Sequence, residues 1–427
     1  MMVHLVFALA VMPATQSDSF PVVTLDEARR RAAVVDPVTI AARAGMSAAI
    51  WERRAARADL LTPSITASTS YLRFSEPFFN FGTGAISPNA TSATLDAHYT
   101  VLGAGKLGAL RRGSASVAQA EAFEILAEYG TALATDAAYY SVLAERELAR
   151  VAADRLRRAT EQLAVARVRV QSGETISTDS LQLMLELNRA RLGVLRSDSG
   201  LSVARLRLGR RMGLAGAVDA APMATTLPPP LPLSLDQAVL EARSDGPDVA
   251  AAIAGERAAG AALSAERSGY LPDVVLSWTT GAYDSEFFPS ATRRSQLAIA
   301  VSLPIWDGGR RELAVARARA QRDIARAERE GREREAAERV TEAWNGYQTG
   351  RAGIELADVG VAIATETFRV QGARYREGAT TILDLLEAQV GLSEAESALI
   401  QARYGARLAL ARLEALLGRR LFDGPGN

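Results

Sequence analysis

In each half of this chain the spacing of hydrophobic positions changes from a helical period to a period of two, and then back to a helical period. Polar and apolar residues alternate almost strictly over residues 64–71, 94–101, 274–279 and 296–303. This period of two predicts strands of about ten residues with one apolar and one polar face. A proline-free helical pattern follows from 106 to 171 and from 310 to 377. Helices of roughly 65 residues, about 100 Å long, need a coiled-coil partner.

The two halves are copies of one unit of roughly 200 residues. The segment from Val23 returns without a gap from Leu233, and RVQSGETISTDSLQLM from Arg169 returns as RYREGATTILDLLEAQ from Arg374. This period is too long for a solenoid repeat of about 20–50 residues. We therefore expect each copy to be a supersecondary assembly that pairs with its twin in one pseudo-symmetric body.

The predicted organisation follows the duplication. Residues 1–17 form a signal peptide, because a short apolar run is followed by small and polar residues, although no lysine or arginine precedes that run. The first repeat is 18–223, with a strand pair at about 64–101 and a long helical hairpin at 106–213. A proline-rich linker, 224–232, leads to the second repeat, 233–418, which has a strand pair at about 273–305 and a long helical hairpin at 310–418. A tail, 419–427, follows the second repeat. The signal cleavage site is not specified by the sequence.

Composition excludes several classes of protein. Lysine plus arginine equals aspartate plus glutamate, so no polycation for nucleic acid is present. Cysteine is absent and the two histidines lie far apart, which gives no thiolate or histidine metal site. With no phosphate-binding glycine loop either, we expect no enzyme, no cofactor and no metal. No stretch approaches 18 uninterrupted apolar residues, so a membrane would be met by strands.

The fold class expected from these patterns is mainly α with a β portion. Four strands have open edges that a bilayer does not tolerate, so a membrane barrel would need other subunits to close it. Aromatic loops from Ser75 and from Asp284 follow the strands, where an interfacial belt would lie. A soluble sheet with aromatic loop contacts is the alternative.

The order of helix, helix, strand pair, very long helix, glycine turn and returning helix, given twice, resembles the TolC-like outer-membrane efflux factors. The motifs LDEA and LDQA, LPDVVLS, LPIWDGGRR and RYREGATTILDLLEAQ carry the resemblance over the whole mature chain. The first copy has GAGK where the second has DGGR. The resemblance implies a homotrimer in the outer membrane of a Gram-negative bacterium, with a twelve-stranded barrel in the lipid that continues as a periplasmic α-barrel.

The same resemblance implies an exit duct of a tripartite efflux or type I secretion system. Its partners would be a periplasmic adaptor and an inner-membrane pump. A water-filled tunnel has little chemical selectivity, so the sequence specifies neither the exported substrate nor the type of pump. A periplasmic coiled-coil adaptor or scaffold is the rival hypothesis; it explains the long helices and leaves the strands unexplained.

The strand pattern assigns faces within such a barrel. The residues expected to face lipid are Leu276, Trp278, Ile299 and Val301, and those expected to face the lumen are Asp96, His98 and Ser277. The resemblance also places acidic rings near the second helix turn, at Asp384 and Glu387. These residues are three apart on one helical face. Asp384 also follows Thr381 in a first helical turn, where it would cap the helix, so ring and cap are both open.

The helix turns carry the remaining candidate residues. Tyr375 matches a tyrosine that bonds across neighbouring coils to keep the family's tip closed. The family's arginine between glycine and aspartate is Thr380 here, which puts that closing salt bridge in doubt, and the candidates to replace it are Arg374 and Arg376. Exposed turns around Val170 to Gly173 and Tyr375 to Gly378 would receive the adaptor. Asp179, the match of Asp384, is expected only to cap its helix.

Overall fold

The computed structural model describes residues 20–422 except 82, 172–176, 225 and 287–290. The first copy contains β1 (Val22–Val23), α1 (Leu25–Val35), α2 (Pro37–Leu61), β2 (Ser64–Asn80), β3 (Ala85–Leu102), α3 (Ala104–Gln171), α4 (Ser177–Arg211) and β4 (Asp219–Ala220). The second contains α5 (Leu235–Asp245), α6 (Pro247–Ser268), β5 (Asp273–Asp284), β6 (Thr292–Ser302), α7 (Arg310–Arg376) and α8 (Ile382–Leu417). The predicted order of elements is therefore present twice, whereas the predicted signal peptide lies outside the described residues.

Helix caps start the first helix of each copy. The Ser234 hydroxyl accepts from the Gln237 amide at 3.3 Å, and the Gln237 side chain accepts from the Ser234 amide at 2.9 Å, which completes a capping box. In the first copy Thr24 accepts from the Glu27 amide, but the Glu27 carboxylate lies 2.8 Å from Arg31 instead. The first capping box is therefore only half formed.

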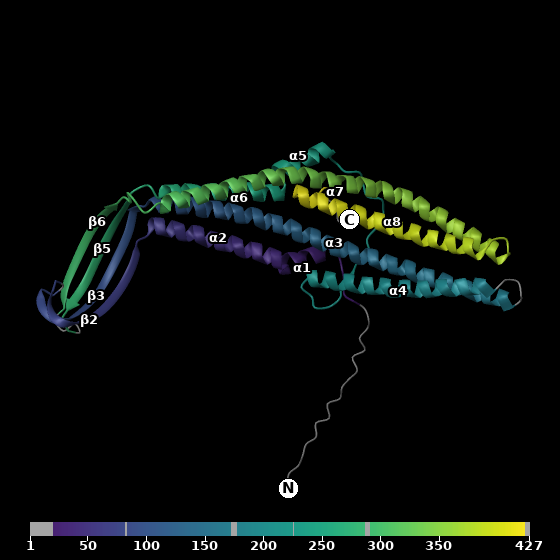
Figure 1. Cartoon of the computed structure of the whole chain (residues 1–427), viewed down its shortest axis with the longest axis horizontal. Coiled ribbons are helices and arrows are strands. Elements are labelled where there is room, and N and C mark those ends of the chain that lie inside the picture. Colours follow the sequence, from purple (N-terminus) through teal and green to yellow (C-terminus); the bar gives the residue numbers. More distant parts are fainter. Residues whose placement is uncertain (1–19, 82, 172–176, 225, 287–290, 423–427) are drawn as a thin grey trace, which may run out of the picture.

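The four long strands form one antiparallel sheet in the order β2-β3-β5-β6. This sheet stands at one end of an elongated molecule (Figure 1). Within the described residues β2 and β6 have one partner each, so both outer edges of the sheet are open. The second strand pair therefore continues the first in a single wall.

The strands of the first pair are longer than the sequence predicts. β2 and β3 have 17 and 18 residues, against 12 and 11 for β5 and β6. The segment from Ser75 was expected to be a loop, and this was wrong, because Phe78 and Phe79 lie within β2 and pair with β3. The register shifts between Arg73 and Phe78, around Pro77, which an edge strand accommodates because its outer N–H groups need no partner. Phe287 and Phe288 lie outside the described residues.

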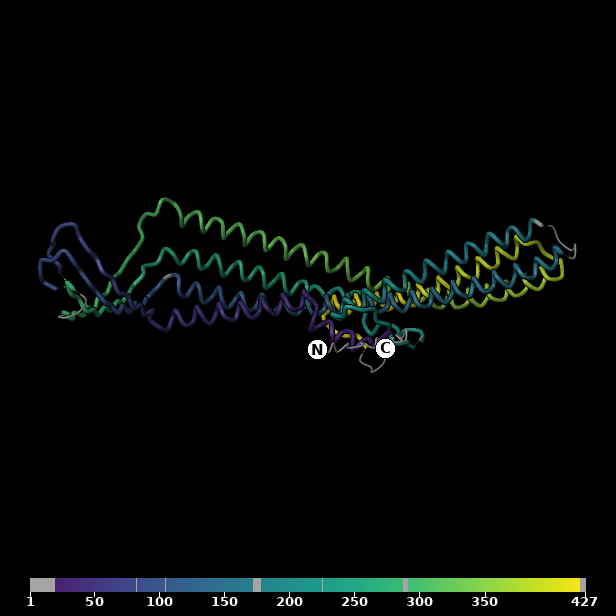
Figure 2. Tube along the Cα trace, turned by 90° about the horizontal axis from the view of Figure 1, so that it is seen from below, coloured from purple at the N-terminus to yellow at the C-terminus, as the bar shows by residue number. Residues whose placement is uncertain are grey.

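The helices form a curved layer that changes composition halfway along the molecule. Near the sheet the neighbours are α2, α3, α6 and α7 in that order, and at the far end they are α4, α3, α8 and α7. α3 and α7, of 68 and 67 residues, run through both halves (Figures 1 and 2). Within the described chain, no single helix is long and apolar enough to cross a membrane; α1 and α2, bent by 48°, pass that test only together.

The coiled-coil partner that the long helices were expected to need is present in the far half, along a continuous seam. Ala159, Leu163 and Ala166 of α3 are buried against Leu183 and Leu187 of α4. Their spacing of four and three residues places them on one face of α3. The same seam continues into α8, whose Leu385 joins this cluster.

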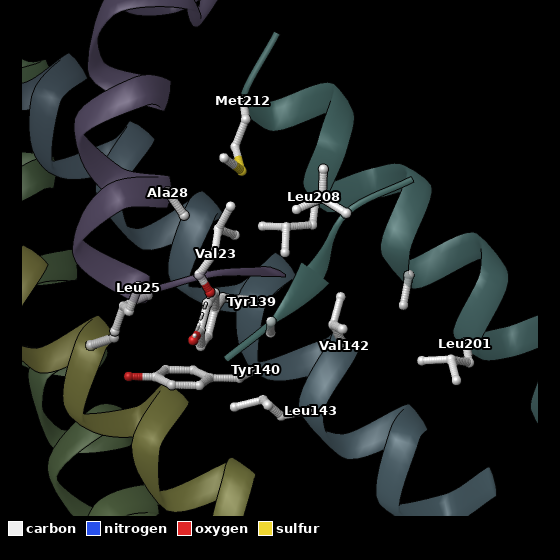
Figure 3. Close-up of a cluster of buried hydrophobic side chains, with 14 residues drawn as sticks. Val23, Leu25, Ala28, Tyr139, Tyr140, Val142, Leu143, Leu201, Leu208 and Met212 are labelled. Carbon is white, nitrogen blue, oxygen red and sulfur yellow. Dashed lines mark hydrogen bonds between the residues drawn. The ribbon is translucent and has the colours of Figure 1, made fainter. Parts of the chain in front are cut away.

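A second core holds the middle of the molecule together (Figure 3). The Tyr139 hydroxyl donates to the carbonyl oxygens of Val23 and Ala221, at 3.3 and 2.9 Å, and so ties α3 to the small parallel sheet of β1 and β4. The Arg29 guanidinium makes two 2.6 Å hydrogen bonds to the buried Asp136 carboxylate. These contacts fasten the start of the first copy to α3, and the sequence pattern gave no sign of them.

Candidate functional site: the helical tips and the four-stranded wall

The tip of the second hairpin is a glycine turn. Gly378 has φ of +73°, a conformation that favours glycine, and the Ala379 amide donates to the Arg374 carbonyl at 2.8 Å. Gly378 therefore turns the chain from α7 into α8, as its pattern predicts. Its match Gly173 lies outside the described residues, and Val170 is half-buried in the last turn of α3.

Tyr375 connects the two hairpins at their tips. Its side chain is 4% exposed, and its hydroxyl donates to Asp179 of α4 at 3.5 Å. Arg169 of α3 donates to the Tyr375 carbonyl oxygen and lies 5.3 Å from the centre of the ring. Burial, followed by the nearby Asp179 carboxylate, raises the pKa of Tyr375, so the hydroxyl stays a neutral donor at ordinary pH.

The contacts among Tyr375, Asp179 and Arg169 bear on two of the expectations from the sequence. Tyr375 does bond across neighbouring coils, here within one chain. The expectation that Asp179 only caps its helix was wrong, because its carboxylate also accepts from Tyr375. Arg169 was not predicted, although its alignment with Arg374 in the duplication was an available signal. Arg374 itself and Arg376 are exposed, and Arg376 donates to the Gly372 carbonyl of its own helix at 3.2 Å.

Asp384 caps α8. One of its carboxylate oxygens accepts from the Thr381 amide at 3.0 Å, from the Thr381 hydroxyl at 2.6 Å and from the Thr380 hydroxyl at 2.8 Å. These hydrogen bonds, those from Thr381 first, lower the pKa of Asp384. The structure thus confirms the cap, while the acidic ring stays a prediction. Glu387 is exposed one turn further along α8.

The cap predicts a pH dependence at the start of α8. Because the folded-state pKa of Asp384 is depressed, its cap is complete above the usual aspartate pKa of about 3.9 and is lost as the pH falls through the lower, folded value. We expect the first turn of α8 to lose amide protection in that range. Hydrogen-exchange mass spectrometry of a peptide covering 377–388 measures it, and the same pH dependence in Asp384→Asn would contradict it.

The sheet register separates the predicted wall residues by face. Leu276 pairs with Ile299, and Val301 and Trp278 lie two residues from this pair on their own strands, so all four share one face. His98 pairs with Ser277 on the opposite face, which Asp96 shares.

On the polar face, hydroxyl side chains of neighbouring strands form a row of hydrogen bonds. Asp96 accepts from Thr279 at 2.7 Å and from Thr94 at 3.0 Å, while Ser68 bonds to Thr94 at 2.7 Å. His98 on this face is exposed. On the apolar face Ile299 is 71% exposed, and no helix of the described residues packs over it. One wall therefore presents a hydrogen-bonding surface on one side and a bare hydrocarbon surface on the other.

This architecture defines a class of protein: a subunit with long helical hairpins, joined to an open strand wall that is apolar on one face. The sequence model described as outer membrane efflux protein matches residues 238–419. The outer membrane efflux protein BepC of Brucella suis is 25% identical over 303 residues, which are 70% of this chain and 65% of BepC. The outer membrane protein TolC of Escherichia coli is 26% identical over 165 residues, 36% of this chain and 34% of TolC.

Solved structures show the same fold. The Campylobacter jejuni CmeC outer membrane channel superposes with a TM-score of 0.82 at 16% identity, covering 92% of this chain and 85% of that one. Sequence and fold agree in their similarity to the outer-membrane efflux proteins of the TolC-like class. The region matched to BepC spans slightly less than two thirds of that protein, at 65%.

Proposed function

We propose that this protein is the outer-membrane exit channel of a tripartite efflux or type I secretion system. The main support for this proposal is the strand wall, whose two faces are chemically opposite. Long helices extend away from one end of this wall. The apolar face suits lipid and the polar face suits a water-filled lumen. The 68 residues of α3 correspond to about 100 Å of helix, enough to line a duct through much of the periplasm. Such a channel is a passive conduit and not an enzyme.

The open edges of the wall support a homotrimer. β2 and β6 would have unpaired backbone groups in the bilayer, which costs several kcal/mol per group. Pairing β6 of one subunit with β2 of the next removes both edges, and three subunits of four strands give a twelve-stranded barrel. A mature protein that is soluble and monomeric without detergent would contradict this assembly.

The tips are proposed as the periplasmic mouth. Three copies of Asp384 and Glu387 would surround one axis there, and the turns from Val170 to Gly173 and from Tyr375 to Gly378 would meet the adaptor. An inner-membrane pump would supply the cargo through that adaptor. The described part of the lumen wall presents hydroxyl groups, which have little chemical selectivity, so in this proposal the exported substrate is set by the pump.

A planar-bilayer recording tests the mouth. We expect the wild-type channel to favour cations and to be blocked by multivalent cations from the tip side, because crowded carboxylates repel one another until cations or protons relieve them. Replacing both acids, Asp384→Asn with Glu387→Gln, should abolish the block and the cation preference in a folded trimer. The matched control is Asp323→Asn with Glu328→Gln, which neutralises two exposed acids of α7 far from the tip. If the block by multivalent cations were unchanged in the first variant, these two acids would act only at the end of their helix and would not form a ring at the mouth.

A further inference from the structure

Two arginines lie on the apolar face of the strand wall. Through the inner strands, Ile65 of β2 is in register with Trp278 of β5 and Leu297 of β6, so these three residues share that face. Arg73 lies four alternate positions after Ile65, and Arg293 lies two alternate positions before Leu297. Alternate residues of a strand point to the same side. Both arginines therefore belong to the face proposed for lipid.

The two arginines lie at the same depth in the wall. β2 begins after α2 at Ser64, nine residues before Arg73. β6 ends before α7 at Ser302, nine residues after Arg293. This length is about 30 Å of strand, and a barrel tilt of about 35–45° leaves about 21–25 Å of height, close to the apolar band of about 25 Å in outer-membrane barrels. Because the helices extend from the other end of the strands (Figure 1), the arginines mark the outer boundary of that band.

The positive charges at this boundary have no counter-charge within the described residues. Arg73 and Arg293 are exposed, and no ion pair joins either of them to another described residue. The regularly paired part of this face has no other charged side chain among residues 65–73, 91–99, 276–282 and 293–301. Asp284, the next residue of this face on β5, is buried and accepts from two backbone amides of the segment that follows it. A bound anion would therefore satisfy both arginines.

Both arginines also lie on edge strands. β2 and β6 are the outer strands of the wall, so closure of the proposed barrel places β6 of one subunit about 4.8 Å from β2 of the next. Each subunit boundary then has one Arg293 and one Arg73 on neighbouring strands. Tyr71, one alternate position before Arg73, supplies an aromatic ring of the kind found at membrane interfaces. A guanidinium group offers paired N–H donors that match the oxygens of a phosphate.

We propose that Arg73 of one subunit and Arg293 of its neighbour bind the phosphate groups of an anionic lipid in the outer leaflet, with one site at each subunit boundary. The ligand is a phosphorylated lipid because its acyl chains would cover the exposed apolar residues below the arginines, such as Leu297 and Ile299, while its phosphates meet the guanidinium groups. The inference rests on the trimeric channel proposed above and names the lipid that surrounds its outer rim.

Lipid binding to the purified trimer tests the site. The probe is lipid A with two phosphate groups, titrated into the detergent-solubilised trimer and counted by native mass spectrometry. We expect Arg73→Gln with Arg293→Gln to weaken its binding roughly tenfold or more, because charge-assisted hydrogen bonds to phosphate are lost. Lipid A without phosphates should bind the wild type as weakly as the double variant does. Inorganic phosphate should not displace the lipid, since it lacks the acyl chains that cover the apolar face.

Arg294 provides the matched control. It follows Arg293 on β6 and pairs with Gly281, so it belongs to the polar face. Arg294→Gln removes the same charge from the lumen side and should leave lipid binding unchanged. Unchanged binding in the double variant, or an equal loss in the control, would overturn the lipid site. Trimers that bind no lipid A would overturn the site and leave the channel, whereas the absence of trimers from the membrane would overturn both.

Discussion

A channel carrying Tyr375→Phe together with Arg169→Ala is expected to conduct several times more current than the wild type in planar bilayers. The two substitutions remove the hydroxyl that reaches Asp179 and the guanidinium that binds the Tyr375 carbonyl. A net hydrogen bond contributes about 0.5–1.5 kcal/mol. In the trimer proposed above there would be two such bonds in each subunit. Losing all of them should shift the equilibrium between closed and open tips by tenfold or more.

The control for this experiment uses the same chemistry elsewhere. The Tyr404 hydroxyl of α8 donates to Glu147 of α3 at 2.6 Å, which also joins the two hairpins but lies near the middle of the molecule. Tyr404→Phe should leave the conductance unchanged while removing a comparable bond. If the tip variant conducted like the wild type, or if both variants opened equally, Tyr375 would be a packing residue and not part of a closure.

The repeated hydrophobic pattern was sufficient to predict most of the fold. The coiled-coil packing of the long helices, the paired strands and the turn at Gly378 follow from spacing alone, because a period of two or of three to four residues indicates which face is buried. The faces of the wall followed in the same way. Leu276 and Ile299 share a face because alternate residues of a strand do, whatever the neighbouring strand is.

Contacts between distant segments could not be predicted in the same way. Arg29 with Asp136, and Tyr375 with Asp179, join residues 107 and 196 positions apart, and nothing in the local pattern selects those partners among the many charged residues. The length of β2 was missed for a different reason. Pro77 indicates a loop in an ordinary strand, whereas an edge strand with a register shift tolerates it.

Leu276→Arg should destabilise the assembled trimer by about 2–4 kcal/mol if this position lies near the bilayer midplane. Leu276 pairs with Ile299, which is 71% exposed and has no helix packed over it within the described part of the chain. The guanidinium would therefore replace hydrocarbon that only lipid can cover. The measurement is the urea midpoint and the heat sensitivity of trimers in the outer-membrane fraction.

The adjacent residue provides the control, because the next position on a strand points to the opposite face. Ser277 pairs with His98 on the polar side, so Ser277→Arg should leave trimer stability nearly unchanged and should instead shift the conductance and ion preference of the open channel. The two variants differ by one position and add the same charge, so their difference reports the environment of each face. Equal tolerance of both, with neither trimer destabilised, would mean that lipid does not cover the apolar face.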